Sequence, residues 1–237
     1  MNSETFSILK RTSTASIATL LFKKGLRNQY IQGVSRLNSA RERMVGPVFT
    51  LRYIPAREDL NPMTVFQDPD HPQRKAVEEI PEGHVLVMDC RQDASAASAG
   101  SILATRLQYR GCAGIVTDGG LRDADDIRAL EMPSFCAKPS APTNLTKHQA
   151  LDVNVPIGCG SVAVFPGDIA VGDGDGVIII PAELADRIAA EAADMETYEA
   201  WVMAQVKDGA SIIGLYPMNA ETRARYEAIQ ANKDKSD

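Results

Sequence analysis

Hydrophobic and polar positions repeat with two different periods along the chain, and these periods predict where helices and strands lie. Residues 13–24 have helical spacing, with Ser13 or Thr14 as the start of the helix and a glycine directly after its end. Gly46–Ile54 alternates between apolar and polar positions, which is typical of a strand. Gly83–Cys90 is a short apolar run between turn residues and therefore predicts a buried strand.

The next segment of the chain changes its pattern several times. Residues 94–110 begin with small side chains and end with helical spacing, which predicts a loop that enters a helix. Ile115–Thr117 predicts a strand, and the two glycines in Asp118–Gly120 predict a turn directly after it. A short helix is expected from there to about Leu130.

The C-terminal part is first rich in turns and then helical. Residues 153–181 alternate short β-branched runs with Pro-Gly-Asp and Gly-Asp-Gly turns, which predicts several strands. Pro181 opens a long amphipathic stretch from about Ala182 to Lys207, since proline is tolerated in the first turn of a helix. A shorter helix is expected after Pro217.

Two segments have neither period. Residues 56–75 are rich in Pro, Asp and Arg and are expected to be irregular, and residues 140–146 are expected to form a loop. The pattern as a whole predicts an α/β fold in a single domain, residues 1–237. Its core is expected at about residues 12–190, followed by a helical C-terminal arm at about residues 191–237.

Composition narrows the classes of partner. Of the 237 residues, 44% are hydrophobic and 24% are charged, which is ordinary for a chain that can bury a full core. The net charge of −6 provides no basic field, so we expect neither nucleic acid nor a membrane as a partner. No apolar run approaches ~20 residues and the N-terminus lacks a signal-peptide core, so we expect a cytoplasmic protein.

Several motifs of other chemistries are missing or incomplete in the sequence. Asp173 and Asp175 lie in "GDGDG", but an EF-hand needs a third acidic ligand and a closing Glu, so we expect a hairpin turn. No G-x-G-x-x-G follows a strand, and no G-x-S-x-G is present. The histidines are expected to be solvated or structural on loops, and the cysteines to be reduced and buried; they are His71, His84 and His148, and Cys90, Cys112, Cys136 and Cys159.

A candidate site lies at Arg122 and Asp123, directly after the two glycines. An arginine can hold a carboxylate or keto oxygen with a fork of donors, and an adjacent aspartate can hold Mg²⁺ or Mn²⁺. Upstream, Ala99–Leu103 leads small residues into a helix, whose free N–H groups can bind a carboxylate. If the strands before these segments are neighbours, the parts could together chelate an α-keto acid. The alternative from spacing alone is a helix cap by Asp123 or Asp125, with Arg122 as a surface charge.

Two glycine-rich segments carry a family resemblance. "GSILATRLQYRGCAGIVTDGGLRD" and "VPIGCGSVAVFPGDIAVGDGDGVIIIP" resemble the family of the 4-hydroxy-4-methyl-2-oxoglutarate aldolases, which are class II pyruvate aldolases, and of the regulator of ribonuclease activity A. The similarity extends from about Thr12 to Tyr216 and is most specific in these segments and in the Pro166–Asp168 hairpin. It implies an α/β/β/α sandwich of the swivelling β/β/α type, assembled as a trimer or hexamer with sites at subunit interfaces.

The resemblance also implies site residues. Backbone amides of one segment would hold the pyruvate carboxylate, and its residues are Gly100, Ser101, Ile102 and Leu103. Arg122 matches the arginine that contacts the keto oxygen, and Asp123 matches the direct ligand of the divalent metal. Ser101 stands where aldolase members usually carry an acidic residue that organises metal-bound water. Glu199 or Glu196 could take the place of an acidic residue that assists through water from a neighbour's C-terminal helix.

The implied function is a lyase that depends on Mg²⁺ or Mn²⁺. The metal and Arg122 would stabilise the enolate formed when the C3–C4 bond of a 4-hydroxy-2-oxoacid breaks, which releases pyruvate and a carbonyl compound. Decarboxylation of oxaloacetate gives the same enolate and is expected as a side activity. Ser101 cannot act as a carboxylate base, so we expect weaker metal binding and turnover. The alternative is a non-catalytic regulator that binds a ribonuclease or another protein, which needs a surface rather than a metal site.

Overall fold

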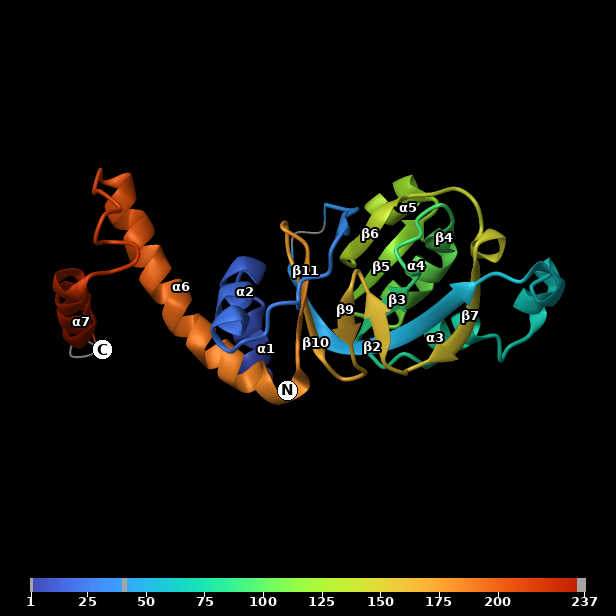
Figure 1. The fold of residues 1–237 in the computed structure, drawn as a ribbon, viewed down its shortest axis with the longest axis horizontal. Helices are drawn as coiled ribbons and strands as arrows, with labels where there is room; N and C mark the ends of the chain where they lie inside the picture. The colour runs from blue at the N-terminus through green and yellow to red at the C-terminus, as the bar shows by residue number, and fades with distance from the viewer. Residues whose placement is uncertain (1, 40–41, 234–237) are drawn as a thin grey trace. The chain divides into compact units, whose positions relative to one another are not determined.

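The structure of the protein, a computed structural model, describes residues 2–39 and 42–233 (Figure 1). The chain divides into two compact units, residues 1–192 and residues 193–237; the first carries the sheets and the second is helical. None of the helices in the described ranges combines the length and the apolar character that crossing a membrane requires.

Strand β2 (Met44–Pro55) organises the larger sheet because its length lets it pair with three other strands. One edge pairs in parallel with β3 (Val85–Asp89). The other edge pairs antiparallel first with β10 (Ile169–Gly172) and then with β7 (His148–Val153). β2 is longer than the sequence predicted, and most of its residues are buried because layers of structure cover both faces of the sheet.

Strand β5 (Gly114–Leu121) lies beside β3 and ends directly before Arg122. Its other edge pairs in parallel with β6 (Ser134–Pro139), and its last residues pair with β4 (Ala97–Ala99). The remaining strands are β1 (Ser35–Arg36) beside β6, β11 (Val177–Ile180) beside β10, and the separate pair β8 (Ile157–Cys159) and β9 (Val162–Val164). Within the described residues, nine strands form one sheet and two form another.

Two hydrophobic cores lie on the two faces of this sheet, because successive residues of a strand point to opposite sides. On one face, Leu86 of β3 packs with side chains from three helices. These are α3 (Pro72–Glu79), α4 (Ser101–Tyr109) and α5 (Ala124–Arg128). On the other face, Val87 packs in a cluster with Val164 and Ile179, which come from β9 and β11.

Helices also cover the side of the unit formed by β10 and β11 (Figure 1). α2 (Thr14–Lys23) packs against β11, and its Ile17 and Leu21 are fully buried. α1 (Ser3–Leu9) and the first residues of α6 (Ala185–Lys207) lie beside it. Layers of helices thus lie on both outer sides of the strand layers, which confirms the expected α/β/β/α sandwich.

The shorter unit contains the rest of α6 and α7 (Ala220–Lys233), which an aromatic cluster joins. Tyr198, Trp201 and Tyr226 lie with their ring centroids 5.2 to 6.4 Å apart. Tyr216 stacks on Tyr198 at 6.2 Å. Aromatic side chains bury a large area each, so a few of them give two helices without a sheet a small core of their own.

The two glycines after Ile115–Thr117 do not form the predicted turn, because β5 continues through both. Close packing requires them instead. A Cβ on Gly119 would lie 2.7 Å from the Cys90 side chain, and a Cβ on Gly120 would lie 2.6 Å from the Cβ of Ser140. The glycines therefore allow β5 to carry the chain straight to Arg122.

Other local predictions are confirmed or corrected. The helix predicted over residues 13–24 is confirmed as α2, and its Ser13 cap accepts a backbone hydrogen bond. Residues 56–75 were expected to be irregular but contain η1 (Glu58–Leu60), η2 (Met63–Gln67) and the start of α3, which begins at a proline. Pro166–Asp168 is a corner rather than a hairpin, because β9 and β10 pair with different strands.

The "GDGDG" hairpin is confirmed as a structural turn between β10 and β11. Asp173 accepts hydrogen bonds from Thr14 N at 2.8 Å, Thr14 Oγ1 at 2.7 Å and Asp175 N at 3.0 Å. No group of three His, Cys, Asp or Glu suited to a metal occurs in the part of the chain that the structure describes. The four cysteines are free and buried, as predicted, whereas His148 is fully buried in β7 rather than on a loop.

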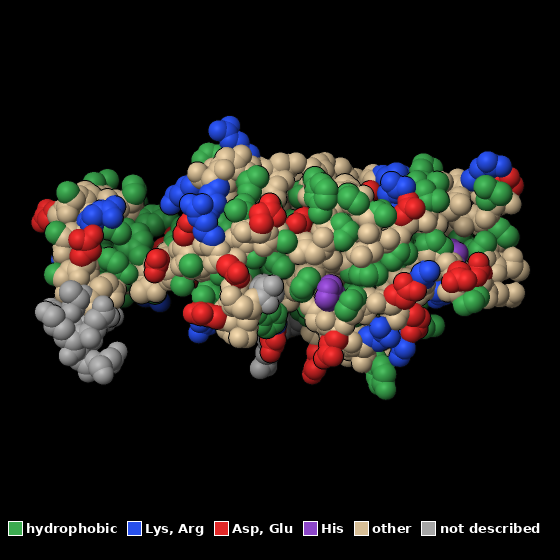
Figure 2. All heavy atoms as spheres, turned by 90° about the horizontal axis from the view of Figure 1, so that it is seen from below, with side chains coloured by type: hydrophobic (Ala, Val, Ile, Leu, Met, Phe, Trp, Pro, Cys, Tyr) green, Lys and Arg blue, Asp and Glu red, His purple; other side chains and the backbone are tan. Residues whose placement is uncertain are grey.

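Surface charge is mixed on the face that Figure 2 shows, where Lys and Arg lie near Asp and Glu at several places. Such a mixture creates little long-range field for any one class of ligand. Recognition of a charged molecule must then come from a local arrangement of side chains and backbone groups.

Candidate functional site

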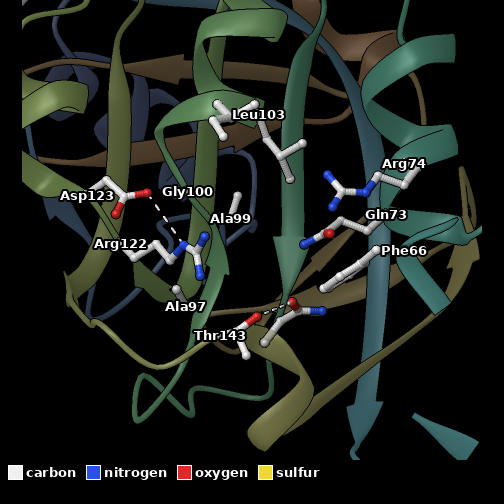
Figure 3. Close-up of a pocket in the computed structure, with 12 residues that line it drawn as sticks. Phe66, Gln73, Arg74, Ala97, Ala99, Gly100, Leu103, Arg122, Asp123 and Thr143 are labelled. Atoms are coloured by element: carbon white, nitrogen blue, oxygen red, sulfur yellow. Dashed lines mark hydrogen bonds and ion pairs between the residues drawn. The ribbon is translucent and has the colours of Figure 1, made fainter. Parts of the chain in front are cut away.

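A small pocket lies where β4 leads into α4 and β5 leads into α5 (Figure 3). Its volume is about 190 Å³, which suits a ligand of a few carbon atoms, because drug-sized ligands need roughly 300–1,000 Å³. We call the segment Ala97–Leu103 together with Arg122 and Asp123 the near wall. The far wall consists of Phe66, Gln73, Arg74, Thr143 and Asn144.

Arg122 and Asp123 lie side by side between β5 and α5. The Arg122 backbone N–H donates to Ala99 O at 3.1 Å, which fixes the end of β5 to the residue before the α4 start. Asp123 has a left-handed backbone conformation (φ 56°, ψ 47°), which aspartate and asparagine adopt more readily than most residues. The structure therefore brings together the two segments that the sequence singled out.

The start of α4 presents backbone donors to the pocket. Gly100 is the N-cap and has no side chain to bond them. Ser101 N donates to Asp123 Oδ2 at 3.2 Å, and Ser101 Oγ lies 3.4 Å from the same oxygen. No hydrogen bond of the Ile102 or Leu103 N–H to another described residue is found, so both can serve a ligand.

Gly100 is needed for the close approach of the two site side chains. A Cβ at this position would lie 2.7 Å from Asp123 Oδ2 and 2.8 Å from Arg122 Nε. The backbone of Gly100 is extended (φ −121°, ψ −176°), so a special conformation is not the reason for glycine here. Glycine keeps the space in which carboxylate, guanidinium and helix start meet.

The Asp123 side chain does not cap α5, although Asp123 occupies the N-cap position. Its Oδ2 instead reaches the start of α4 and lies 3.5 Å from Arg122 Nε. Both side chains are about two-fifths exposed, at 43% for Arg122 and 41% for Asp123. The helix-cap alternative therefore holds for the position of Asp123. It does not hold for the Asp123 carboxylate, which contacts the start of α4 instead of capping α5.

The oxygen atoms at Asp123 and Ser101 suit one kind of metal site. Mg²⁺ commonly keeps several waters and binds through one or two carboxylates together with oxygens of the substrate. The Asp123 carboxylate, with Ser101 Oγ beside it, matches that pattern and does not match a closed cage of protein ligands. Glu196 and Glu199 belong to the second unit, where Glu199 accepts a hydrogen bond from Tyr216 at 2.9 Å. Their part in metal binding stays a prediction.

Sequence reasoning missed the far wall. Gln73 Nε2 donates to Ser98 O at 2.6 Å and lies 3.1 Å from the Tyr53 hydroxyl, so α3 is tied to the residue between Ala97 and Ala99. The Arg74 guanidinium lies over the Phe66 ring at 4.6 Å. The sequence did offer one signal for the far wall, because Pro72 is a typical first residue of a helix and Arg74 follows it. Residues 56–75 as a whole are rich in turn-forming residues, however, and were therefore expected to be irregular.

Other reactive groups lie outside this pocket. Asp118 is buried in β5 and accepts backbone hydrogen bonds from Cys90, Gln92 and Gly160 at 2.6 to 3.1 Å. Burial nevertheless raises its pKa. Burial also raises the pKa of the Cys112 thiol to about 11, so the thiolate form is scarce near neutral pH. Asp118 holds the loops after β3 and β8, and Cys112 is no ready nucleophile.

Comparisons with known proteins place the chain among relatives. The family model "RraA-like: Aldolase/RraA" matches residues 14–179, which is more than half of the chain. A 4-hydroxy-4-methyl-2-oxoglutarate aldolase of Thermus thermophilus is 31% identical over 141 residues, or 60% of this chain and 77% of the relative. The crystal structure of Streptomyces coelicolor RraAS2, an unusual member of the RNase ES inhibitor RraA protein family, matches with a TM-score of 0.74 and 30% identity. That match covers 85% of this chain and 96% of the Streptomyces chain.

The chain spans about half the length of other curated relatives that it matches. A protein of Halalkalibacterium halodurans is 40% identical over 107 residues, which are 45% of this chain and 50% of that protein. An uncharacterized protein of Methanocaldococcus jannaschii is 33% identical over 114 residues, or 46% and 52%. Both pocket walls lie within residues 14–179, the part of the chain that the family model matches. The activity of this chain must be argued from the chemistry of the pocket.

Proposed function

The chain belongs to the RraA-like family, and on that premise we propose that it is a lyase that cleaves a 4-hydroxy-2-oxoacid into pyruvate and a carbonyl compound. The observation that carries the proposal is the near wall, where Arg122, Asp123 and the start of α4 meet at one small pocket. Relatives named as 4-hydroxy-4-methyl-2-oxoglutarate aldolases support a lyase of this class.

Binding of the keto acid would use groups that the near wall presents. The Ile102 and Leu103 N–H groups would donate to the substrate carboxylate, helped by the positive end of the α4 dipole. The Asp123 carboxylate bonds Ser101 N at 3.2 Å and would have to release that donor if a substrate carboxylate took all the amides. Competition of this kind predicts that carboxylate binding and the position of the Asp123 side chain are coupled.

Catalysis would rest on charge placed where negative charge develops. When the C3–C4 bond breaks, the C4 hydroxyl loses its proton to water and becomes the carbonyl of one product, while the bonding electrons form an enolate whose keto oxygen the Arg122 guanidinium would stabilise. A proton from water then adds to C3 of the enolate and gives pyruvate. Removal of one such donor typically costs about 10²–10³ in turnover. A divalent cation on Asp123 would supply a Lewis acid for the same oxygen. Oxaloacetate decarboxylation forms the same enolate, so we propose it as a side activity.

A coupled assay for pyruvate release tests the proposal. The protein is incubated with several 4-hydroxy-2-oxoacids and with oxaloacetate, each with Mg²⁺, with Mn²⁺ and with a chelator. We expect release that needs the metal and that falls by about 10²–10³ in Arg122→Ala. Release that is equally fast with chelator would remove the metal from the proposal, and no release from any substrate would remove the lyase.

A regulator is the second candidate, and the similarity to the Streptomyces protein favours it. A regulator that binds a ribonuclease needs a complementary surface and makes no use of the near wall. Ser101, in place of an acidic residue, is compatible with this role. Binding to a purified ribonuclease that survives Arg122→Ala and Asp123→Asn, in a protein without pyruvate release, would favour the regulator.

We also propose a homo-oligomer, a trimer or a hexamer, as the resemblance implies. In the shorter unit, apolar side chains remain exposed at Met203 (55%), Ile212 (59%) and Ile213 (87%). Apolar groups of this size are common at subunit contacts. Light scattering that gives the mass of a monomer at micromolar concentration would contradict this assembly.

A further inference from the structure

A buried network of hydrogen bonds lies directly behind the pocket and centres on Ser98. Ala97 and Ala99 line the pocket (Figure 3), whereas Ser98, between them, is fully buried and is not among the described residues that line it. Successive side chains of a strand point to opposite sides, so the Ser98 side chain points away from the pocket. The groups that hold Ser98 in place therefore also hold this part of the near wall.

Two donors from outside β4 converge on the Ser98 carbonyl oxygen. The Tyr53 hydroxyl donates to it at 2.9 Å, and Gln73 Nε2 donates to it at 2.6 Å. Gln73 Nε2 also donates to the Tyr53 hydroxyl oxygen at 3.1 Å, so the three groups form a closed triangle. Burial raises the pKa of the Tyr53 hydroxyl well above its usual value, which keeps this donor protonated.

The Ser98 side chain ties the same residue to β5. Its Oγ donates to Gly120 O at 2.9 Å. One residue further along β4, the Ala99 carbonyl accepts the Arg122 N–H at 3.1 Å. The Tyr53 hydroxyl is therefore connected with the backbone of Arg122 through two consecutive residues of β4 and two hydrogen bonds.

We propose that Tyr53 is a positioning residue for Arg122 and that it acts through the backbone of β4. This inference rests on the proposed function, in which the Arg122 guanidinium stabilises the enolate oxygen. The guanidinium can do so only where the Arg122 backbone places it, and a misplacement of about 1 Å can cost about 10²-fold in rate. Tyr53 itself does not touch the substrate, because it is 1% exposed and lies outside the pocket.

The alternative role for Tyr53 is to fill the core. Its ring belongs to the hydrophobic cluster on the helical face of the sheet and lies 5.8 Å from the His148 ring, between centroids. Tyr53→Phe separates the two roles, because this variant keeps the ring in the core and removes only the hydroxyl that donates to Ser98 O.

Steady-state kinetics of pyruvate release test the proposal. Tyr53→Phe should lower kcat by about tenfold, because one of the two donors to Ser98 O is lost while that of Gln73 remains. KM should stay nearly unchanged, because the amides proposed to bind the substrate carboxylate lie on α4, which the fully buried Leu107 anchors in the core. A loss that appears in KM alone, or no loss at all, would overturn the proposal.

A double-mutant cycle asks whether Tyr53 acts through Arg122. In the Arg122→Ala background, Tyr53→Phe should change kcat by less than about twofold, since the guanidinium that it positions is absent. A residue that merely supports the fold would cost the same factor in both backgrounds. An equal loss of kcat in the two backgrounds would therefore contradict the proposal.

Tyr30→Phe is the matched control, because the Tyr30 hydroxyl also donates to a backbone carbonyl, that of Asp175 in the turn between β10 and β11. This variant should keep the kcat of the wild type, and a loss as large as that of Tyr53→Phe would count against a specific role of Tyr53. Ser98→Ala removes the donor to Gly120 O and should lower kcat as Tyr53→Phe does. A loss in Tyr53→Phe without one in Ser98→Ala would rule out the path through β4.

Amide hydrogen exchange separates a failure of this inference from a failure of the lyase. In Tyr53→Phe the Arg122 N–H, which donates to Ala99 O, should exchange about tenfold faster. The Ile115 N–H, which donates to Pro133 O near the start of β5, should exchange as in the wild type. If no substrate releases pyruvate but this selective change occurs, the lyase is wrong and the link from Tyr53 to Arg122 stands. If pyruvate is released and both amides exchange as in the wild type, the lyase stands and the positioning role is wrong.

Discussion

The near wall and the far wall of the pocket are built in different ways. The near wall comes from two short segments: Ala97–Leu103, which contains β4 and the start of α4, and Arg122–Asp123, which follows the neighbouring strand β5. The far wall comes from η2, α3 and the segment that leads into η3 (Asn144–Thr146), and this last segment is distant from the other two in the sequence. The near wall offers backbone donors and an ion pair, whereas the far wall offers a stacked guanidinium and the amide of Asn144, whose Nδ2 has no hydrogen-bond partner among the described residues.

The difference in construction suggests different roles for the two walls: the near wall would carry out the proposed reaction, and the far wall would select among keto acids. The proposed lyase chemistry needs groups held by the strand ends of the sheet, because small displacements there would cost activity. Selection among keto acids needs only a group that meets the remote end of the ligand. We therefore expect variants of the near wall to change turnover for every substrate, and variants of the far wall to change the choice of substrate.

The largest effect is expected for Arg122→Ala. Loss of the guanidinium removes the donor to the enolate oxygen and should lower kcat for pyruvate release by about 10²–10³. Stability should hardly change, because the side chain is 43% exposed. Arg128→Ala is the control, since Arg128 is an exposed arginine on α5 that pairs only with Asp125 among the described residues. A loss in Arg122→Ala that is confined to dianionic substrates would contradict the division between the walls.

Asp123→Asn should have the next largest effect. Asparagine tolerates the left-handed backbone at this position, whereas alanine there would cost about 1–2 kcal/mol in the folded state. The neutral amide should lower Mg²⁺ affinity by more than about tenfold, the minimum that loss of even an outer partner costs. Titration calorimetry measures this, with Asp125→Asn as the exposed control. Unchanged affinity in Asp123→Asn would mean that the metal, if any, binds elsewhere.

The sequence was informative for the near wall and silent on the far wall, for a physical reason. Arg122, Asp123 and the small residues before α4 are adjacent to strand ends, so local pattern was enough to single them out. That they meet was expected only on the condition that the strands before them are neighbours, and from the family resemblance. Arg74 and Asn144 reach the pocket only through long-range contacts, such as the hydrogen bond from Gln73 to Ser98 O. No local pattern records such a contact.

The glycines of β5 show the same limit at smaller scale. Gly119 and Gly120 were interpreted as a turn because glycine often marks one. Glycine is needed at these positions because Cys90 and Ser140, which are distant from them in the sequence, approach them closely in the fold. The α/β class and most strands could be predicted from period and burial, and the α/β/β/α order from the family resemblance, while exact strand ends could not.

A moderate effect is expected for Ser101→Asp, which adds a charge to the near wall. Ser101 Oγ lies 3.4 Å from Asp123 Oδ2, so the new carboxylate would face the existing one. The two would repel each other without metal and share a bound cation, and Mg²⁺ affinity should rise by about tenfold. Ser101→Asn is the control of equal size without charge. If both variants bind Mg²⁺ like the wild type, Ser101 does not limit the metal site.

The smallest effect concerns the far wall and pH. Burial lowers the pKa of the His71 imidazole, and the neighbouring Arg74 guanidinium lowers it further, while Asp68 acts in the opposite direction. His71 precedes α3 and its ring lies at the edge of Phe66, 5.3 Å between centroids. The folded protein therefore binds fewer protons there than the unfolded chain does once the pH falls below about 6.5, the ordinary value for histidine.

It follows that the contribution of His71 to the free energy of unfolding should be constant above about pH 6.5, fall as the pH drops from there to the lowered pKa of His71, and be constant again below that pKa. Burial also lowers the pKa of His148, so wild-type protein alone cannot assign the effect. Urea unfolding at several pH values should show a shallower pH dependence in His71→Phe, which keeps the ring contact with Phe66 and cannot titrate. Arg74→Ala should also make it shallower, because one cause of the shift is gone. If neither variant changes the slope, the imidazole is not coupled to Arg74, and the far wall is held by packing alone.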